Sequence, residues 1–294
     1  MVQFSPDVPN GTDEWDVPLG GLPGLARVML ERTHVEAAVA EVRFVSDHSE
    51  LPESVAIDVW KALGTEKFPI FEPANQVMVT LTITPEGPQQ SQQAQQGWLL
   101  ATSDRATAVT LLPATVIVQT RNYSRYSTSL AKPLAQVLEL FTAATGVTLI
   151  QRLGLRYINR LAEKDATTPA FWRDHIREPF AGPLNGAVAD LVSGIHQQVQ
   201  LKLAETAGAR IQCGVFEEPQ VGAPTSNRNY NYLVDLDVFS EQAAPYDATM
   251  SANMVRQLNR TALALFATVL SDQYLAQLSP MPAEPATDKE RDKR

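Results

Sequence analysis

The sequence has a single cysteine, Cys213, among its 294 residues. One cysteine cannot form an internal disulfide, which is typical of a protein from a reducing compartment. The chain also lacks a run of 18 apolar residues, so we expect no membrane-spanning helix. Its first residues, MVQFSPDVPNGTDEWD, have neither the basic segment nor the apolar segment of a secretory signal. These absences predict a cytoplasmic protein without a membrane partner.

Motifs for catalysis are absent as well. The four histidines do not occur in an HxxxH or HExxH spacing, and Cys213 has no CxxC partner, so a zinc site is not expected. The glycine-rich phosphate loops GxxxxGK[ST] and GxGxxG do not occur, and neither does GxSxG, the motif of a serine nucleophile. We therefore expect no cofactor, and we favour a protein that is not an enzyme.

The composition indicates a folded protein, with 44% hydrophobic and 19% charged residues. The length corresponds to about two domains, or to one domain built from two halves. The net charge of −9 argues against bulk binding of nucleic acid, so a protein partner is the better expectation.

The hydrophobic patterns predict an α+β fold: an antiparallel sheet in two similar halves, each with strands followed by a long amphipathic helix, and helices packed on one face. The expected organisation is an irregular arm (1–32), a first half (33–162), a connector (163–187), a second half (188–278) and a disordered tail (279–294).

Individual elements follow from the same patterns. The Gln-rich segment 85–97 is interpreted as a solvated hairpin loop, and Pro113 within the β segment Ala106–Tyr123 indicates a bulge, an edge or two separate strands. The expected strands are Val35–Val45, Gln76–Thr84, Gly97–Asp104, Thr148–Leu161, Arg210–Phe216 and Tyr230–Phe239, and the expected helices are Leu51–Leu63, Ser127–Thr145 and Ser251–Leu278.

The segment GLRYINRL, residues 154–161, carries the strongest functional signal. In a strand, Arg152, Arg156 and Arg160 share one face, while Asn159, a fourth candidate binding residue, lies on the other face with apolar residues. Guanidinium groups bind carboxylates and phosphates in a bidentate manner, so this arginine strip could recognise an anion. The favoured interpretation is structural: ion pairs with acidic residues on neighbouring strands.

Two carboxylates of the segment YLVDLDVF are candidates for those ion pairs. Asp235 and Asp237 share one face of an expected strand, and Glu41 on the first strand is a third candidate. An aspartate pair can also hold a hard cation, which leaves a metal site as a weaker alternative.

The segment TRNYSRYS, residues 120–127, interleaves Arg121 and Arg125 with Tyr123 and Tyr126. This mixture is typical of surfaces that stack the bases of single-stranded nucleic acid. The segment is short and leads directly into a helix, so an ordinary strand-to-helix junction is favoured.

The GLRYINR strand, the early strand VEAAVAEVRF, the tyrosines before the central helix and the late strand YLVDLDVF occur in a distinctive order. In this order and spacing the chain resembles a sporadically distributed bacterial family of uncharacterised proteins, about 250 residues or longer. The resemblance spans roughly residues 33–275. It implies a bacterial cytoplasmic protein and no established activity.

The leading functional hypothesis is a non-enzymatic binding or interaction protein of the bacterial cytoplasm, linked to mobile or phage-related DNA through the sporadic distribution of the similar family. The alternatives are a metal-dependent hydrolase or nuclease that uses Asp235 and Asp237, and a nucleotide or nucleic-acid sensor that uses Arg152, Arg156 and Arg160.

Overall fold

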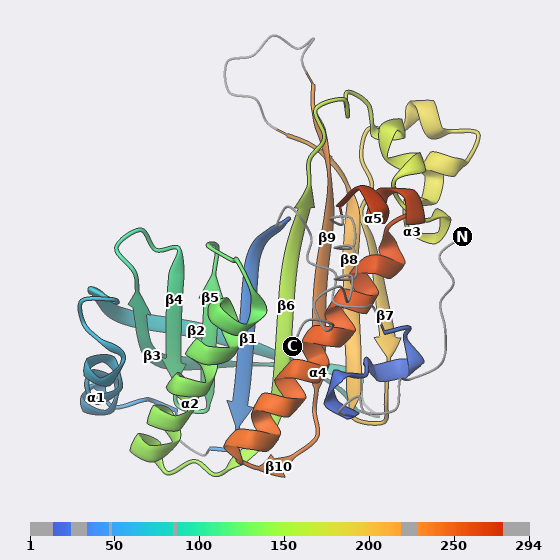
Figure 1. Ribbon diagram of the computed structural model, residues 1–294. Helices are drawn as coiled ribbons and strands as arrows, with labels where there is room; N and C mark the ends of the chain where they lie inside the picture. Colours follow the sequence, from blue (N-terminus) through green and yellow to red (C-terminus); the bar gives the residue numbers. More distant parts are fainter. Residues whose placement is uncertain (1–13, 25–33, 47–48, 85–86, 219–227, 279–294) are drawn as a thin grey trace, which may run out of the picture.

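The computed structural model describes residues 14–24, 34–46, 49–84, 87–218 and 228–278, and of residues 76–94 only the backbone. Its strands form one ten-stranded antiparallel sheet, in the order β2-β3-β4-β5-β1-β6-β9-β8-β7, with β10 beside β6. Figure 1 shows the helices α2 and α4 lying across one face of this sheet. The predicted α+β class and antiparallel sheet are thus confirmed.

The strands are β1 (Val35–Phe44), β2 (Ile70–Thr84), β3 (Gly87–Ala101), β4 (Thr107–Leu112), β5 (Thr115–Thr120), β6 (Leu149–Leu161), β7 (Gln197–Lys202), β8 (Ala207–Glu217), β9 (Tyr230–Ser240) and β10 (Ala244–Pro245). The α-helices are α1 (Glu53–Leu63), α2 (Lys132–Thr145), α3 (Glu178–Ala181), α4 (Ala248–Val269) and α5 (Asp272–Leu278). Shorter helical turns are η1 (Glu14–Asp16), η2 (Leu19–Gly21), η3 (Ser127–Ala131), η4 (Pro169–Asp174), η5 (Gly182–Asn185) and η6 (Ala189–Leu191).

The strands β1 and β6 pair at the middle of the sheet and join its two parts. Ala40 of β1 lies opposite Leu155 of β6, and the outer neighbours of the pair are β5 and β9. Alternate residues of β1 are fully buried under the helices, including Ala38, Ala40 and Val42. Because side chains alternate along a strand, the residues between them face the opposite side.

The core fills the space between the sheet and its helices. The face of α2 that carries Leu134, Val137, Leu138 and Phe141 is buried, as the spacing of these residues predicts. Pro133 in the first turn and Gly146 after the last, with a φ of 72°, mark the two ends of this helix. The helix Ser127–Thr145 is thus confirmed, with a π-helical first turn, η3.

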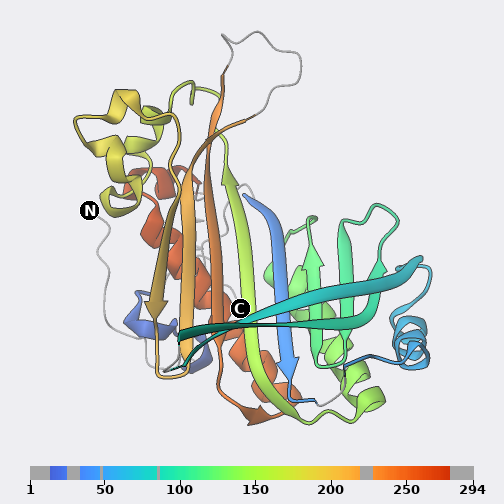
Figure 2. The ribbon, with the colours of Figure 1, turned by 180° about the vertical axis from the view of Figure 1, so that it is seen from behind.

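The expected hairpin loop at 85–97 is wrong. Residues 87–97 belong to β3, which pairs with β2 along its whole length and forms a long two-stranded ribbon. The backbone hydrogen bonds of the ribbon do not depend on side-chain type, so a Gln-rich segment can supply the second strand. Residues 85–86 lie outside the described part of the chain. The ribbon extends across the side of the sheet opposite the helices (Figure 2).

An aromatic stack anchors the base of the ribbon. The ring of Phe71 lies between those of Trp60 and Trp98, with centroid distances of 4.9 Å and 4.7 Å. Trp60 belongs to α1, so the stack fixes this helix to β2 and β3.

Further along the chain, Pro113 separates β4 from β5. Of the three expected alternatives for this segment, the structure therefore has two separate strands.

The expected single helix Ser251–Leu278 is two helices. Helix α4 begins at Ala248, where the Asp247 side chain accepts a hydrogen bond from the Met250 N–H. The helix stops at Val269 because Leu270 is extended and forms a β-bridge with Ile176 of the connector. The Ser271 hydroxyl then accepts a hydrogen bond from the Tyr274 N–H in the first turn of α5.

Part of the expected irregular arm packs against α4. The Leu19 N–H donates a hydrogen bond to Thr261 Oγ1, and the Arg260 side chain pairs with Asp16 at 3.3 Å. We call residues 14–24 the N-terminal strap. The rest of the arm and the expected disordered tail 279–294 lie outside the described residues.

No helix in the described part of the chain has both the length and the apolar character needed to cross a membrane.

A test of the ribbon concerns Gly97, which directly precedes the part of β3 that pairs with β4. A Cβ atom there would overlap the Leu111 carbonyl oxygen and lie 3.0 Å from the Leu112 Cα, so backbone would have to move. We expect Gly97→Ala to lower the free energy of unfolding by ~1–3 kcal/mol in urea denaturation.

Gly186→Ala is the control, because a Cβ there meets only the Pro183 carbonyl oxygen, at 3.5 Å. It should change stability by less than ~0.5 kcal/mol. Equal stability of the two variants would contradict a close crossing at Gly97.

Candidate functional site

The alternation along β6 places the arginine strip on the face of the sheet opposite α2 and α4. In the described part of the chain no helix covers this face, and the β2–β3 ribbon crosses it (Figure 2). Along β6, Leu153, Leu155 and Tyr157 are buried, whereas Arg156 is exposed and Arg152 and Arg160 are half-buried. We call this side the helix-free face. The alternation agrees with the period of two on which the strip was predicted.

Arg152 is the most enclosed member of the strip, with 15% of its side chain exposed. Its Nη1 donates to Glu41 Oε1 at 2.9 Å, and its Nη2 reaches Asp237 Oδ2 at 3.5 Å. The guanidinium also lies over the Phe239 ring, 4.6 Å from the centroid. It occupies the space above Gly154, where a Cβ would be 2.7 Å from Nη1. Arg152 therefore bridges three strands.

Arg156 forms a bidentate pair with Asp235 of β9. Its Nε and Nη2 donate to the two carboxylate oxygens at 2.8 Å and 2.6 Å. The Asp235 side chain is 7% exposed, while that of Arg156 is 48% exposed. This fork geometry is the strongest arrangement of a guanidinium and a carboxylate.

Arg160 lies toward the end of β6 and is paired less closely. Its Nη1 is 3.2 Å from Glu218 Oε1, and its Nε is 3.8 Å from Glu36 Oε2. Each arginine of the strip therefore has an acidic neighbour, as the structural interpretation expects.

Asp237 lies at the centre of these charges. Burial raises the pKa of this carboxyl above its ordinary value, and it outweighs the lowering effects of Arg152, Arg210 and Arg156. The negative charge of Glu41 also raises the pKa of Asp237; Glu41 pairs with Arg43 at 2.7 Å as well. We call the set Glu41, Arg43, Arg152, Arg156, Asp235 and Asp237 the charge network.

The charge network bears on the metal alternative. Asp235 binds Arg156 and Asp237 contacts Arg152, so guanidinium groups occupy the positions that a cation would take. Within the described residues, no group of three or more His, Cys, Asp and Glu side chains could hold a metal ion.

Asn159 lies on the opposite side of β6, inside the core. It is 5% exposed, and its amide donates to the Val234 carbonyl of β9 at 3.0 Å. Here the amide satisfies backbone of the neighbouring strand.

The tyrosines before α2 also pack on the helix side. Tyr123 meets Tyr157 edge to face, with centroids 5.7 Å apart, and the Tyr157 hydroxyl donates to Asn259 of α4. Burial raises the pKa of Tyr123 and of Tyr126 above the ordinary value of a phenol. These rings belong to a junction between the sheet and α4, as the favoured interpretation expects.

Arg121 and Arg125, in contrast, are exposed and have no ion-pair partner among the residues that the structure describes. The structure thus separates the predicted cluster into half-buried rings and exposed cations.

Sequence reasoning missed Arg210 as a site residue. Its strand β8 pairs with β9 so that Arg210 lies opposite Asp237, and β7 places Gln200 on its other side. Arg210 and Gln200 are exposed, and Gln212 donates to Gln198 beside them at 3.3 Å. The sequence shows the strand, but only the register across β7, β8 and β9 brings these residues onto the arginine face.

Compared with known protein families and with curated proteins, the chain matches none.

The first test of the charge network is Arg156→Gln. The substitution leaves the buried Asp235 carboxylate without its bidentate partner, so we expect a loss of about 1–3 kcal/mol in the free energy of unfolding. The double variant Arg156→Gln/Asp235→Asn should recover part of this loss, because no unpaired charge remains. Urea denaturation of both variants measures the difference; full stability of Arg156→Gln alone would contradict a structural role.

The second test uses the raised pKa of Asp237. A carboxyl with a raised folded-state pKa contributes stability below its ordinary pKa of 3.8, and this contribution is lost as the pH rises through the folded-state value. The stability of the natural chain minus that of Asp237→Asn should therefore fall as the pH rises above 3.8. Chemical denaturation across this range measures it, and a difference that grows with pH would show a lowered pKa instead.

Proposed function

We propose that the protein is a non-enzymatic binding protein, and that a protein partner binds the flank of the helix-free face formed by β8 and β7. The observation that carries the proposal is the contrast between the centre and the flank of this face. In the centre, the charged groups are already paired with one another. On the flank, Arg210, Gln198, Gln200 and Lys202 are exposed.

The chemistry of the flank supports a protein partner. Amides donate and accept hydrogen bonds, and an exposed guanidinium adds one strong donor group. Such a surface suits the polar groups of another protein, where charged positions set the specificity of the contact. The net charge of −9 opposes the dense phosphate backbone of nucleic acid.

The pairing within the charge network supports binding rather than hydrolysis. A carboxylate that serves as a metal ligand or a general base needs an accessible oxygen, whereas both oxygens of Asp235 accept hydrogen bonds from Arg156. An anion sensor that uses the strip would have to displace carboxylates from Arg152 and Arg156.

We also propose that the two parts of the sheet are similar units. This division counts β6 with the second part, rather than with the first half 33–162 expected from the sequence. The first and last long strands of each part are then neighbours, β1 with β5 and β6 with β9. A long helix follows on the same face in each part, with only the short strand β10 between β9 and α4. The GLRYINR resemblance supports a bacterial cytoplasmic protein with a link to mobile or phage-related DNA.

Affinity capture of the full chain from a lysate of its native host tests the binding function. We expect the double variant Arg210→Gln/Lys202→Gln to lose at least ten-fold of a protein that the natural chain retains. It removes two exposed cations of the flank and substitutes no member of the charge network.

The matched control is Arg121→Gln/Arg125→Gln, which removes the same charge from the loop before α2. It should retain the partner in full. Loss of the partner in this control alone, or no specific retention by the natural chain, would contradict the proposed surface.

A further inference from the structure

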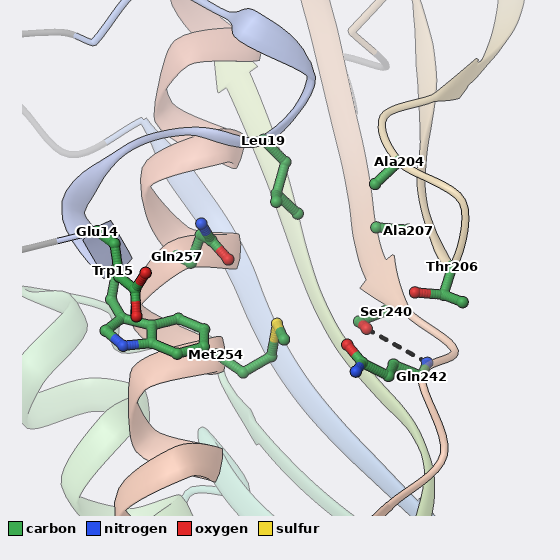
Figure 3. A pocket seen from close by; sticks show the side chains of 10 residues that line it. All are labelled: Glu14, Trp15, Leu19, Ala204, Thr206, Ala207, Ser240, Gln242, Met254 and Gln257. Atoms are coloured by element: carbon green, nitrogen blue, oxygen red, sulfur yellow. Dashed lines mark hydrogen bonds between the residues drawn. The ribbon is translucent and has the colours of Figure 1, made fainter.

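A pocket of about 280 Å³ lies on the other side of the molecule, beside the N-terminal half of α4. The N-terminal strap forms one wall, α4 the floor, and the β7–β8 turn with the end of β9 the facing wall (Figure 3). Its volume is slightly below the ~300–1,000 Å³ of sites for drug-sized ligands, so an occupant is a small molecule. None of the residues discussed for the helix-free face lines it.

The strap wall is held in place by hydrogen bonds to α4. The Gln257 side chain donates to the Val17 carbonyl at 3.2 Å, and the Leu19 N–H donates to Thr261 Oγ1 at 2.9 Å. Asp16, between the pocket residues Trp15 and Leu19, pairs with Arg260. These contacts fix the strap along more than one turn of α4, so this wall of the pocket is held in place by the fold itself.

The lining offers negative charge and hydrogen-bond acceptors. Glu14 is the one ionisable group among the ten lining residues, which include no Lys, Arg or His. Gln257 uses its amide N–H toward the strap, and Figure 3 shows its oxygen turned toward the pocket. On the facing wall, the Ser240 hydroxyl and the Gln242 side chain add further polar atoms (Figure 3).

The apolar part of the lining is suited to the body of a small cation. Trp15 contributes an indole ring, and Met254 and Leu19 contribute aliphatic surface. A cation is attracted by the face of an indole ring and by a carboxylate together. The net charge of −9 adds a long-range attraction for cations.

We propose that this pocket binds a small organic cation, with its ammonium group at the Glu14 carboxylate and the Gln257 oxygen and its apolar body between Trp15 and Met254. This site is separate from the proposed partner surface and does not depend on it.

Three probes of nearly equal shape test the proposal: phenethylammonium, the neutral 2-phenylethanol and the anionic 3-phenylpropanoate. Ligand-observed NMR titrations with the full chain at neutral pH and about 0.15 M salt, where long-range surface attraction is screened, give their dissociation constants. We expect phenethylammonium to bind at least ten-fold more tightly than 2-phenylethanol, and 3-phenylpropanoate to bind most weakly.

Glu14→Gln should bring the affinity for phenethylammonium to within about two-fold of that for 2-phenylethanol. Because Glu14 is exposed, the variant retains the fold. Glu66→Gln is the control, since it removes the same charge from an exposed turn after α1 and should leave all three affinities unchanged. Equal affinity of the three probes, absence of binding, or an equal effect of the two variants would overturn the proposal.

Discussion

The antiparallel pairing of β1 with β6 is the contact on which the rest of the structure depends. It joins the strands β2–β5 to the strands β7–β9 in one sheet. The same pair separates core from charge: Ala40 and Leu155 point under the helices, while Glu41 and Arg152 meet on the opposite side. Because side chains alternate along each strand, one register fixes both the packing of the core and the geometry of the charge network.

The sequence predicted the features that depend on local periodicity. The faces of β6 and the helix at Ser127–Thr145 follow from periods of two and 3.6 residues, and the acidic candidates for the arginines were identifiable. The pairing of each arginine with a particular carboxylate could not be predicted, because it depends on the register between strands. Arg156 lies opposite Asp237 but binds Asp235 diagonally. The ribbon was missed for another reason. Glutamine, proline and glycine indicate a loop, whereas the strand at 87–97 owes its conformation to hydrogen bonds with β2.

The charge network explains why the arginine strip is a weak candidate for direct anion recognition. Asp235 and Arg152 are largely removed from water, and a new anion would have to replace a carboxylate that is already well placed. Breaking such a pair leaves a buried charge without a partner, which costs more than the pair itself contributes. Arg210 needs no such exchange, since it is exposed and lies beside Asp237 without a side-chain hydrogen bond or ion pair among the described residues. The proposed recognition surface therefore lies on the flank of this face rather than on β6.

The two proposed sites share strands but not faces. Ala207 of β8 and Ser240 of β9 line the pocket, while Arg210 and Asp237, three residues away along the same strands, belong to the helix-free face. In each strand the two residues are three positions apart, so their side chains point to opposite faces of the sheet. Substituting an outward side chain leaves the backbone and the inward neighbours in place. The loss of a protein partner and the loss of a small cation are therefore separable measurements on one molecule.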